Sequence, residues 1–225
     1  MEPTFAYATP VVAAQAHPAE RMAFLRKVYG LLALSTFIAG ASAFMTASTP
    51  AVVQLAREHQ FLLFALEIAA IFFTFWARKK ETIGLVALFS FVALTGVTTA
   101  PITLTYTGGT IANAAMLTGI IFVGLSIYTV TSKKDFTFMG GMLTTGLIIL
   151  IVGGLLNMFV FQSSGMSFLF SAGGAFLFSG FIIYDTFNIL NRYPTDEYIS
   201  ATLTLYLDVL NLFLMLLRLV GGSRD

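Results

Sequence analysis

The 225-residue sequence contains no cysteine and very little charge. Without cysteine the chain has no disulfide, no thiolate nucleophile, no iron–sulfur cluster and no thiolate zinc site. Charged residues make up 10% of the sequence, whereas soluble domains contain roughly 25%. A chain with so few charges does not build a water-soluble surface.

An excess of one charge sign is also missing. Twelve Lys and Arg residues stand against 11 Asp and Glu residues, which leaves a net charge of +1, and no basic stripe is interleaved with aromatic residues. We therefore expect no nucleic-acid partner. The two histidines, His17 and His59, lie outside the apolar runs, which argues against a metal site and against a histidine-assisted serine nucleophile.

Apolar residues are abundant instead. They form 57% of the sequence, and the mean hydropathy is +0.87. Seven apolar runs approach the ~20 residues that a helix needs to cross a bilayer, and they are continuously apolar, which favours helices over barrel strands. The expected fold is an all-α integral membrane protein with seven transmembrane helices, at 28–47, 61–77, 83–103, 111–130, 138–161, 168–190 and 199–220.

These runs divide the chain into an amino-terminal segment (1–27), a transmembrane domain (28–220) and a short tail (221–225). The amino-terminal segment lacks the features of a cleaved signal, so we expect it to be retained. The stretch Pro18–Val28 is predicted to be either a basic amphipathic helix, with Met22, Phe24 and Leu25 dipping into lipid, or a plain positive flank. Because the connections leave no room for a soluble catalytic domain, we expect no enzyme activity.

The basic residues predict the orientation of the chain. Nine of the 12 Lys and Arg residues fall in the amino-terminal segment or in the second, fourth and sixth connections: Arg21, Arg26, Lys27, Arg78, Lys79, Lys80, Lys133, Lys134 and Arg192. Because cytoplasmic loops carry an excess of Lys and Arg, the amino terminus is predicted to be cytoplasmic. No endoplasmic-reticulum retrieval signal is present, so we expect a multi-pass protein of the bacterial inner membrane.

Three acidic residues lie inside the expected helices: Glu67, Asp185 and Asp208. An ionisable side chain costs ~2.5–3.5 kcal/mol in a membrane helix on insertion scales, so each one is a functional hypothesis. The sequence midpoint of Asp185 and Asp208 falls between Asp196 and Glu197, inside the polar turn 191–197. If the last two helices fold back as an antiparallel hairpin, both carboxylates reach a similar depth, roughly 10 Å inside the cytoplasmic boundary.

Two asparagines accompany this pair. Asn188 and Asn211 each follow an aspartate by three residues, which places an amide on the same helical face. Two carboxylates close together in a low dielectric do not both stay ionised cheaply, so one is expected to hold a proton near neutral pH. Loss of that proton would push the helices apart unless a cation enters. The pair is therefore predicted to sense pH and to control an ion pathway.

Calcium suits these oxygen ligands, but it usually takes six to eight of them. Two aspartates and two asparagines fall short, so water or backbone carbonyls would complete the shell. We expect calcium as a transported ion and no other cofactor. A structural interpretation stays open, in which the pair is a protonated hydrogen bond that ties two helices together. Glu67 is predicted to be either a second waypoint for the cation or a protonated packing residue.

Two segments, Ser179–Leu190 and Ala201–Gly222, resemble the Bax inhibitor-1 family, also called the transmembrane Bax inhibitor motif family, in its bacterial type. The resemblance implies a seventh helix central among the other six and a pH-sensitive calcium leak controlled by Asp185 and Asp208. It also implies an arginine latch from the second helix to the sixth-helix aspartate, for which Arg78 is the nearest candidate. The basic run that begins at Arg78 is alternatively a simple positive flank.

Two other functions remain open. Intramembrane aspartyl proteases also place two aspartates on consecutive helices, one of them after a tyrosine as at Tyr184. In those enzymes, however, the second aspartate ends a Gly-x-Gly-Asp motif, whereas the residues before Asp208 here are Leu205-Tyr206-Leu207. A non-conducting membrane protein that binds and modulates other membrane proteins, such as a membrane-anchored protease, is the second alternative.

Overall fold

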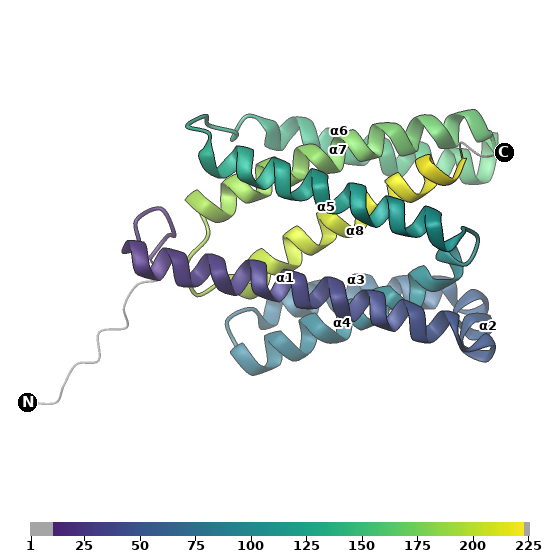
Figure 1. Cartoon of the computed structure of the whole chain (residues 1–225), viewed down its shortest axis with the longest axis horizontal. Coiled ribbons are helices and arrows are strands. Elements are labelled where there is room, and N and C mark those ends of the chain that lie inside the picture. Colours follow the sequence, from purple (N-terminus) through teal and green to yellow (C-terminus); the bar gives the residue numbers. More distant parts are fainter. Residues whose placement is uncertain (1–10, 223–225) are drawn as a thin grey trace, which may run out of the picture.

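The computed structural model describes residues 11–222, which fold into a helical bundle (Figure 1). Its elements in chain order are α1 (Pro18–Ala47), α2 (Pro50–Glu58), α3 (Gln60–Ala77), α4 (Glu81–Thr103), α5 (Gly108–Thr131), α6 (Met139–Leu156), a π-helical turn (Asn157–Phe161), α7 (Ser164–Asn191) and α8 (Tyr198–Gly221). Seven helices within the described range are long and apolar enough to cross a membrane: α1, α3, α4, α5, α6 with its π-helical turn, α7 and α8. The predicted all-α fold with seven spans is confirmed.

The start of α1 differs from the prediction. The helix begins at Pro18, ten residues before the expected start of the span, and proline suits a first turn because its missing N–H needs no partner there. Met22 is exposed, but Phe24 is only 2% exposed and belongs to the same core cluster as Tyr198 and Ile199. The prediction that Phe24 dips into lipid is therefore wrong, because the packed interior of the bundle extends past the apolar run.

Helix α2 has no counterpart among the predicted spans. It is nine residues long, whereas a helix needs about 20 residues to cross a bilayer. It begins with Pro50 after the end of α1 and leads directly into α3 (Figure 1). The connection between the first two spans is therefore a short ordered helix and not a loop.

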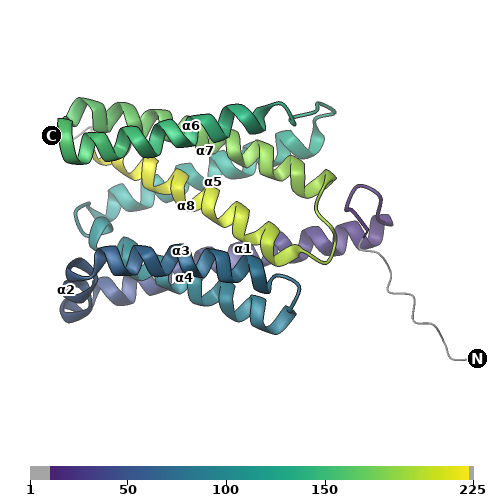
Figure 2. The ribbon, with the colours of Figure 1, turned by 180° about the vertical axis from the view of Figure 1, so that it is seen from behind.

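Helix α8 lies at the centre of the bundle (Figures 1 and 2). It packs against α1, α3, α4, α5 and α7, whereas α6 packs chiefly against α7. Its amino-terminal half is almost completely buried, including Ile199, Leu203 and Leu205. The predicted central position of the last helix is confirmed. A polar side chain on this half of α8 is therefore surrounded mostly by other helices and not by lipid.

The connections alternate between the two ends of the bundle. The start of α1 shares one end with the α3–α4, α5–α6 and α7–α8 connections (Figure 1). The nine basic residues that predict the orientation therefore gather at one end, which we call the basic end. The opposite end, with α2 and the α4–α5 connection, is called the far end. That the basic end faces the cytoplasm stays a prediction.

Candidate functional site

The α7–α8 hairpin brings two acidic side chains into contact. The carboxyl groups of Asp185 on α7 and Asp208 on α8 are close enough to form a hydrogen bond with each other. Asp208 is 5% exposed, and Asp185 is half-buried. An ionised carboxylate only accepts hydrogen bonds, so a bond between two carboxyl groups requires a proton on one of them. The two carboxyl groups therefore lie close enough to share one proton.

This aspartate pair lies inside the bundle, nearer to the basic end. At 1.5 Å per residue, Asp185 lies about 9 Å from the last residue of α7, and Asp208 lies about 15 Å from the first residue of α8. Both helices are antiparallel neighbours (Figures 1 and 2). Because the two carboxyl groups are in contact, the folded hairpin places them at similar depth.

Of the two asparagines, only Asn188 contacts the pair. Its side chain lies close enough to Asp185 to form a hydrogen bond, whereas the Asn211 amide donates to the carbonyl of Leu207 at 2.8 Å, one turn earlier on its own helix. Two buried oxygens, Asn188 Oδ1 and Asp208 Oδ2, have no hydrogen-bond partner among the described residues. Buried polar atoms are normally paired, and exceptions mark functional sites or unseen water and ions. The pair thus has spare oxygen capacity for a further group.

A cluster of hydroxyl groups adjoins the site through Thr186, the residue after Asp185. The hydroxyl of Tyr29 on α1 lies near those of Thr186 on α7 and Ser126 on α5. Neither Ser126 nor Thr186 forms a hydrogen bond of ordinary geometry within the described part of the chain. The interior therefore presents polar groups from four helices around the start of the α7–α8 hairpin.

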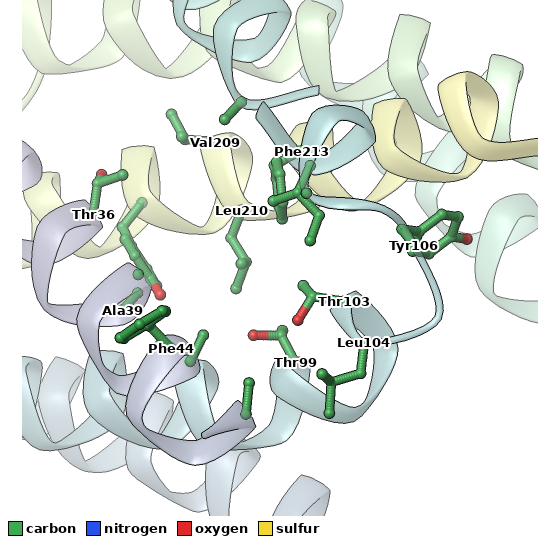
Figure 3. A pocket seen from close by; sticks show the side chains of 17 residues that line it. Thr36, Ala39, Phe44, Thr99, Thr103, Leu104, Tyr106, Val209, Leu210 and Phe213 are labelled. Atoms are coloured by element: carbon green, nitrogen blue, oxygen red, sulfur yellow. The ribbon is translucent and has the colours of Figure 1, made fainter. Parts of the chain in front are cut away.

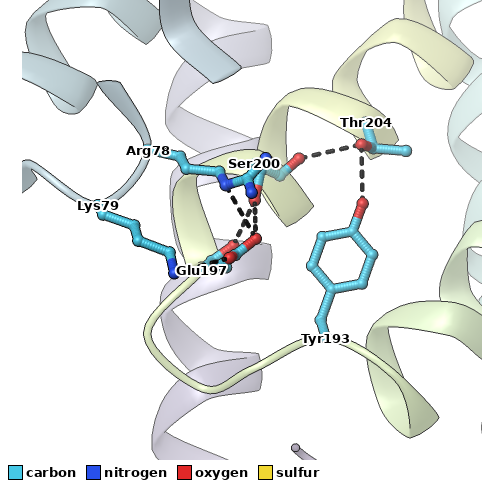
Figure 4. A network of polar contacts seen from close by, with 6 residues as sticks. All are labelled: Arg78, Lys79, Tyr193, Glu197, Ser200 and Thr204. Carbon is cyan, nitrogen blue, oxygen red and sulfur yellow. Dashed lines mark hydrogen bonds and ion pairs between the residues drawn. The ribbon is translucent and has the colours of Figure 1, made fainter. Parts of the chain in front are cut away.

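A second polar network covers the α7–α8 connection at the basic end (Figure 4). Arg78 Nε lies 3.2 Å from Glu197 Oε2, and Lys79 Nζ lies 3.8 Å from Glu197 Oε1. The hydroxyl of Tyr193 lies 3.3 Å from Thr204 Oγ1. Burial raises the pKa of Tyr193, and the charges of Asp185 and Glu197 raise that pKa further. Tyr193 therefore lies close to Asp185 as a neutral phenol.

Arg78 does not contact Asp185 in this structure. Its ion pair is with Glu197, in the turn before α8 (Figure 4). The latch between Arg78 and the sixth-span aspartate that the resemblance implies is therefore not formed in this conformation, and it stays a prediction about another one. The sequence did not indicate the role of Glu197, because an acidic residue in a polar turn is normally exposed to solvent. Its ion pairs form only because the end of α3 packs beside this turn.

The amino-terminal segment also holds the α7–α8 connection. The backbone N–H of Ala13 donates to the carbonyl of Tyr193 at 2.9 Å, and that of Thr195 donates to the carbonyl of Val11 at 3.1 Å. The Thr195 hydroxyl donates to Glu20 Oε1 at 2.6 Å. The turn that joins the two aspartate-bearing helices is thus tied to the start of the chain as well as to Arg78.

Glu67 belongs to a separate polar cluster. The hydroxyl of Thr98 on α4 donates to Glu67 Oε1 on α3, and the hydroxyls of Thr95 on α4 and Tyr206 on α8 contact each other. Tyr206 and Asp208 are two residues apart on α8, so their side chains leave the helix on roughly opposite faces. Glu67 therefore lies on the other side of α8 from the aspartate pair.

The metal-binding capacity of the aspartate pair stays a prediction. The described residues contain no group of three or more His, Cys, Asp or Glu side chains placed to hold a metal ion. Asp185, Asp208 and Asn188 supply fewer oxygens than the six to eight that calcium usually takes. A calcium ion at this position would need further oxygen ligands from water or backbone carbonyls.

Comparison with known proteins identifies relatives along almost the whole chain. A family model described as inhibitor of apoptosis-promoting Bax1 (Bax1-I) matches residues 21–225. The Golgi anti-apoptotic protein of Vaccinia virus is 37% identical over 226 residues, covering 99% of this chain and 94% of the relative. Protein lifeguard 4 of Mus musculus is 36% identical over 97% of this chain and 92% of its own length. An uncharacterized membrane protein of Vibrio cholerae is 43% identical over 69% of this chain and 73% of its own length.

Proposed function

The chain belongs to the Bax1-I family of membrane proteins, and on that premise we propose that it is a pH-sensitive cation leak protein whose gate is the Asp185–Asp208 pair. The observation that carries this proposal is the contact of two carboxyl groups inside a membrane-spanning bundle. Intramembrane acids are costly, and they commonly mark ion and proton pathways. A contact between two of them on neighbouring helices couples protonation to helix packing.

The gate works through charge repulsion between α7 and α8. At low pH one proton is shared, and the hydrogen bond between Asp185 and Asp208 holds the helices together. At higher pH the proton leaves, and two unit charges 4 Å apart repel by about 4 kcal/mol at an effective dielectric constant of 20. That energy shifts the balance between closed and open forms by at most about a thousandfold. The leak should therefore increase as pH rises.

Calcium is the proposed cargo. A divalent cation that enters the deprotonated pair neutralises both carboxylates, and the unpartnered oxygen of Asn188 offers a further hard ligand. Because this ligand set is incomplete, binding is weak enough for the ion to leave again, which passage requires. Glu67, on the other side of α8, is proposed as a second waypoint and not as part of the gate.

The proposed setting is the inner membrane of a bacterium, crossed several times, with the amino terminus in the cytoplasm. The support is the concentration of nine basic residues at the basic end, together with the positive-inside tendency of membrane proteins. In this orientation the aspartate pair lies nearer to the cytoplasm than to the outside. The gate would then respond mainly to cytoplasmic pH.

The direct test is calcium flux from liposomes that contain the purified protein. The wild-type chain should release calcium faster at alkaline than at acidic pH. In Asp185→Asn and Asp208→Asn the added amide cannot ionise, so both variants should stay at the slow acidic rate at every pH. Asp196→Asn is the matched control, because Asp196 is an exposed acid in the α7–α8 connection, and it should leak like the wild type.

Unchanged flux in both aspartate variants would remove the proposed gate. A wild-type protein that releases no calcium at any pH would favour the alternative function, in which the protein modulates membrane partners without conducting ions. Cleavage of a transmembrane peptide, lost in the same two variants, would instead support an intramembrane aspartyl protease.

A further inference from the structure

A cavity of about 660 Å³ lies in the half of the bundle nearer to the far end, between α1, α4, α5 and α8 (Figure 3). A second cavity of about 430 Å³ continues it toward the basic end, between α1 and α5 and over α8. The two cavities share the lining residues Thr36, Ala115, Val209 and Phe213. Together they form one elongated space, which we call the α1–α5 groove.

The lining of the α1–α5 groove is suited to hydrocarbon. Among residues 11–222, no charged side chain lines either cavity. The threonine hydroxyls along the groove are occupied, because Thr36 donates to the carbonyl of Leu32 at 2.8 Å, Thr99 to that of Thr95 at 2.7 Å, and Thr103 to that of Ala100 at 2.9 Å. The groove therefore does not present these donors to a polar ligand.

The groove opens sideways and not only at its ends. Helices α1 and α5 each pack against α8 but make little contact with each other, so α8 is visible between them (Figure 1). The flanking side chains are large, apolar and exposed, with Phe37 and Phe44 on α1 and Met116 and Ile120 on α5. The groove is therefore continuous with the surface that faces the bilayer, and its floor is the central helix.

We infer that the α1–α5 groove binds an acyl chain of a membrane phospholipid, which lies against Val209, Leu210 and Phe213 of α8. These three side chains project into the cavity from the central helix (Figure 3). An unfilled apolar cavity of this size forfeits the dispersion contacts of its lining. The solvent beside the opening is hydrocarbon, so an acyl chain from the adjacent leaflet restores these contacts without desolvating any polar group.

The test is photo-crosslinking in liposomes with a phospholipid that carries a diazirine near the end of one acyl chain. Labelled peptides are then identified by mass spectrometry. The wild-type chain should be labelled on α8 around Leu210, which lines the groove, as well as on the exposed faces of α1 and α5. Labelling confined to those exposed faces, with α8 unlabelled, overturns the inference.

A pair of glycine substitutions on α1 supplies the matched comparison. Gly40 lines the groove, whereas Gly30 lies on the same helix outside it, and a Cβ added at either position meets nothing within 4 Å. Gly40→Leu should fill the groove and remove most of the α8 labelling, while Gly30→Leu should keep it. Undiminished α8 labelling in Gly40→Leu overturns the inference. Crosslinking is measured independently of calcium flux, so this experiment tests lipid binding separately from the proposed gate.

Discussion

At the residue scale, the buried polar contacts between helices differ in whether their side chains can become charged. Tyr206 and Thr95 join α8 to α4 through two neutral hydroxyls, whose contact does not change over the ordinary pH range. Asp185 and Asp208 join α8 to α7 through two acids. Of these two contacts, only the second can reverse from attraction to repulsion when a proton leaves, so the proposed pH sensing rests on it.

The Tyr206–Thr95 contact should be purely structural. Hydrogen bonds between membrane helices contribute about 0.6 kcal/mol on average and about 1.7 kcal/mol at most. Tyr206→Phe should therefore lower the free energy of unfolding in detergent by about that amount, because Thr95 keeps its bond to the carbonyl of Val92 at 2.8 Å. The exposed Tyr128 provides the control, and Tyr128→Phe should cost less. Equal losses in the two variants would contradict the assignment.

The contact between the two aspartates could be predicted from the sequence, but the residues that surround it could not. The sequence midpoint of Asp185 and Asp208 falls inside one polar turn, so an antiparallel hairpin is enough to bring the two side chains to similar depth. Tyr29 approaches the site through the packing of α1, and Glu197 meets its two basic partners through the packing of α3. No local sequence pattern specifies the positions of these two helices. The spacing of Asn211 predicts a supporting ligand, whereas in the structure its amide nitrogen donates to its own helix, and its role as a ligand stays a prediction.

At the element scale, the α1–α4 crossing depends on a close backbone approach at Gly96. A Cβ at this position would lie 2.4 Å from the carbonyl oxygen of Ala39 and 2.7 Å from Cβ of Ser42. The obstructing atoms belong to the backbone and the first side-chain atom of α1, so a rotamer change cannot relieve the clash. The helices themselves would have to move apart.

Gly96→Ala should therefore destabilise the protein, because overpacking typically costs about 1–3 kcal/mol. Gly124→Ala on α5 is the matched control, since its Cβ meets nothing within 4 Å and alanine is the better helix former. Thermal unfolding in detergent should show a lower midpoint for the first variant and an unchanged or higher midpoint for the second. The opposite order would show that α1 and α4 do not approach as described.

The number and approximate positions of the membrane-spanning helices could be predicted, because each apolar run is long enough to cross a bilayer. Helix ends were harder to predict where polar residues continue a helix beyond the hydrocarbon. Arg21 and Arg26 made the start of α1 look like a flank, yet Phe24 on another face of the same turns is buried against α8. The hydropathy of the sequence indicates where the chain leaves the bilayer. The helix itself can extend further, as α1 does, where one of its faces packs against another helix.

At the scale of the whole molecule, the α7–α8 connection is held from several sides. Backbone hydrogen bonds link it to residues 11–13, and ion pairs link Glu197 to Arg78 and Lys79. Partly exposed ion pairs contribute about 0–1 kcal/mol, which is less than the roughly 4 kcal/mol of repulsion between two deprotonated carboxylates. The ties at the basic end can therefore order the closed form without preventing its opening.

The most direct test of the gate is the separation of α7 and α8 in lipid bilayers as a function of pH. The natural chain has no cysteine, so Phe176→Cys on α7 and Arg218→Cys on α8, both at exposed positions, accept one spin label each. The distance between the labels is read by electron paramagnetic resonance. It should be longer at alkaline than at acidic pH, and it should not respond to pH when Asp185→Asn is added. An identical distance at both pH values in the otherwise native chain would contradict the gate.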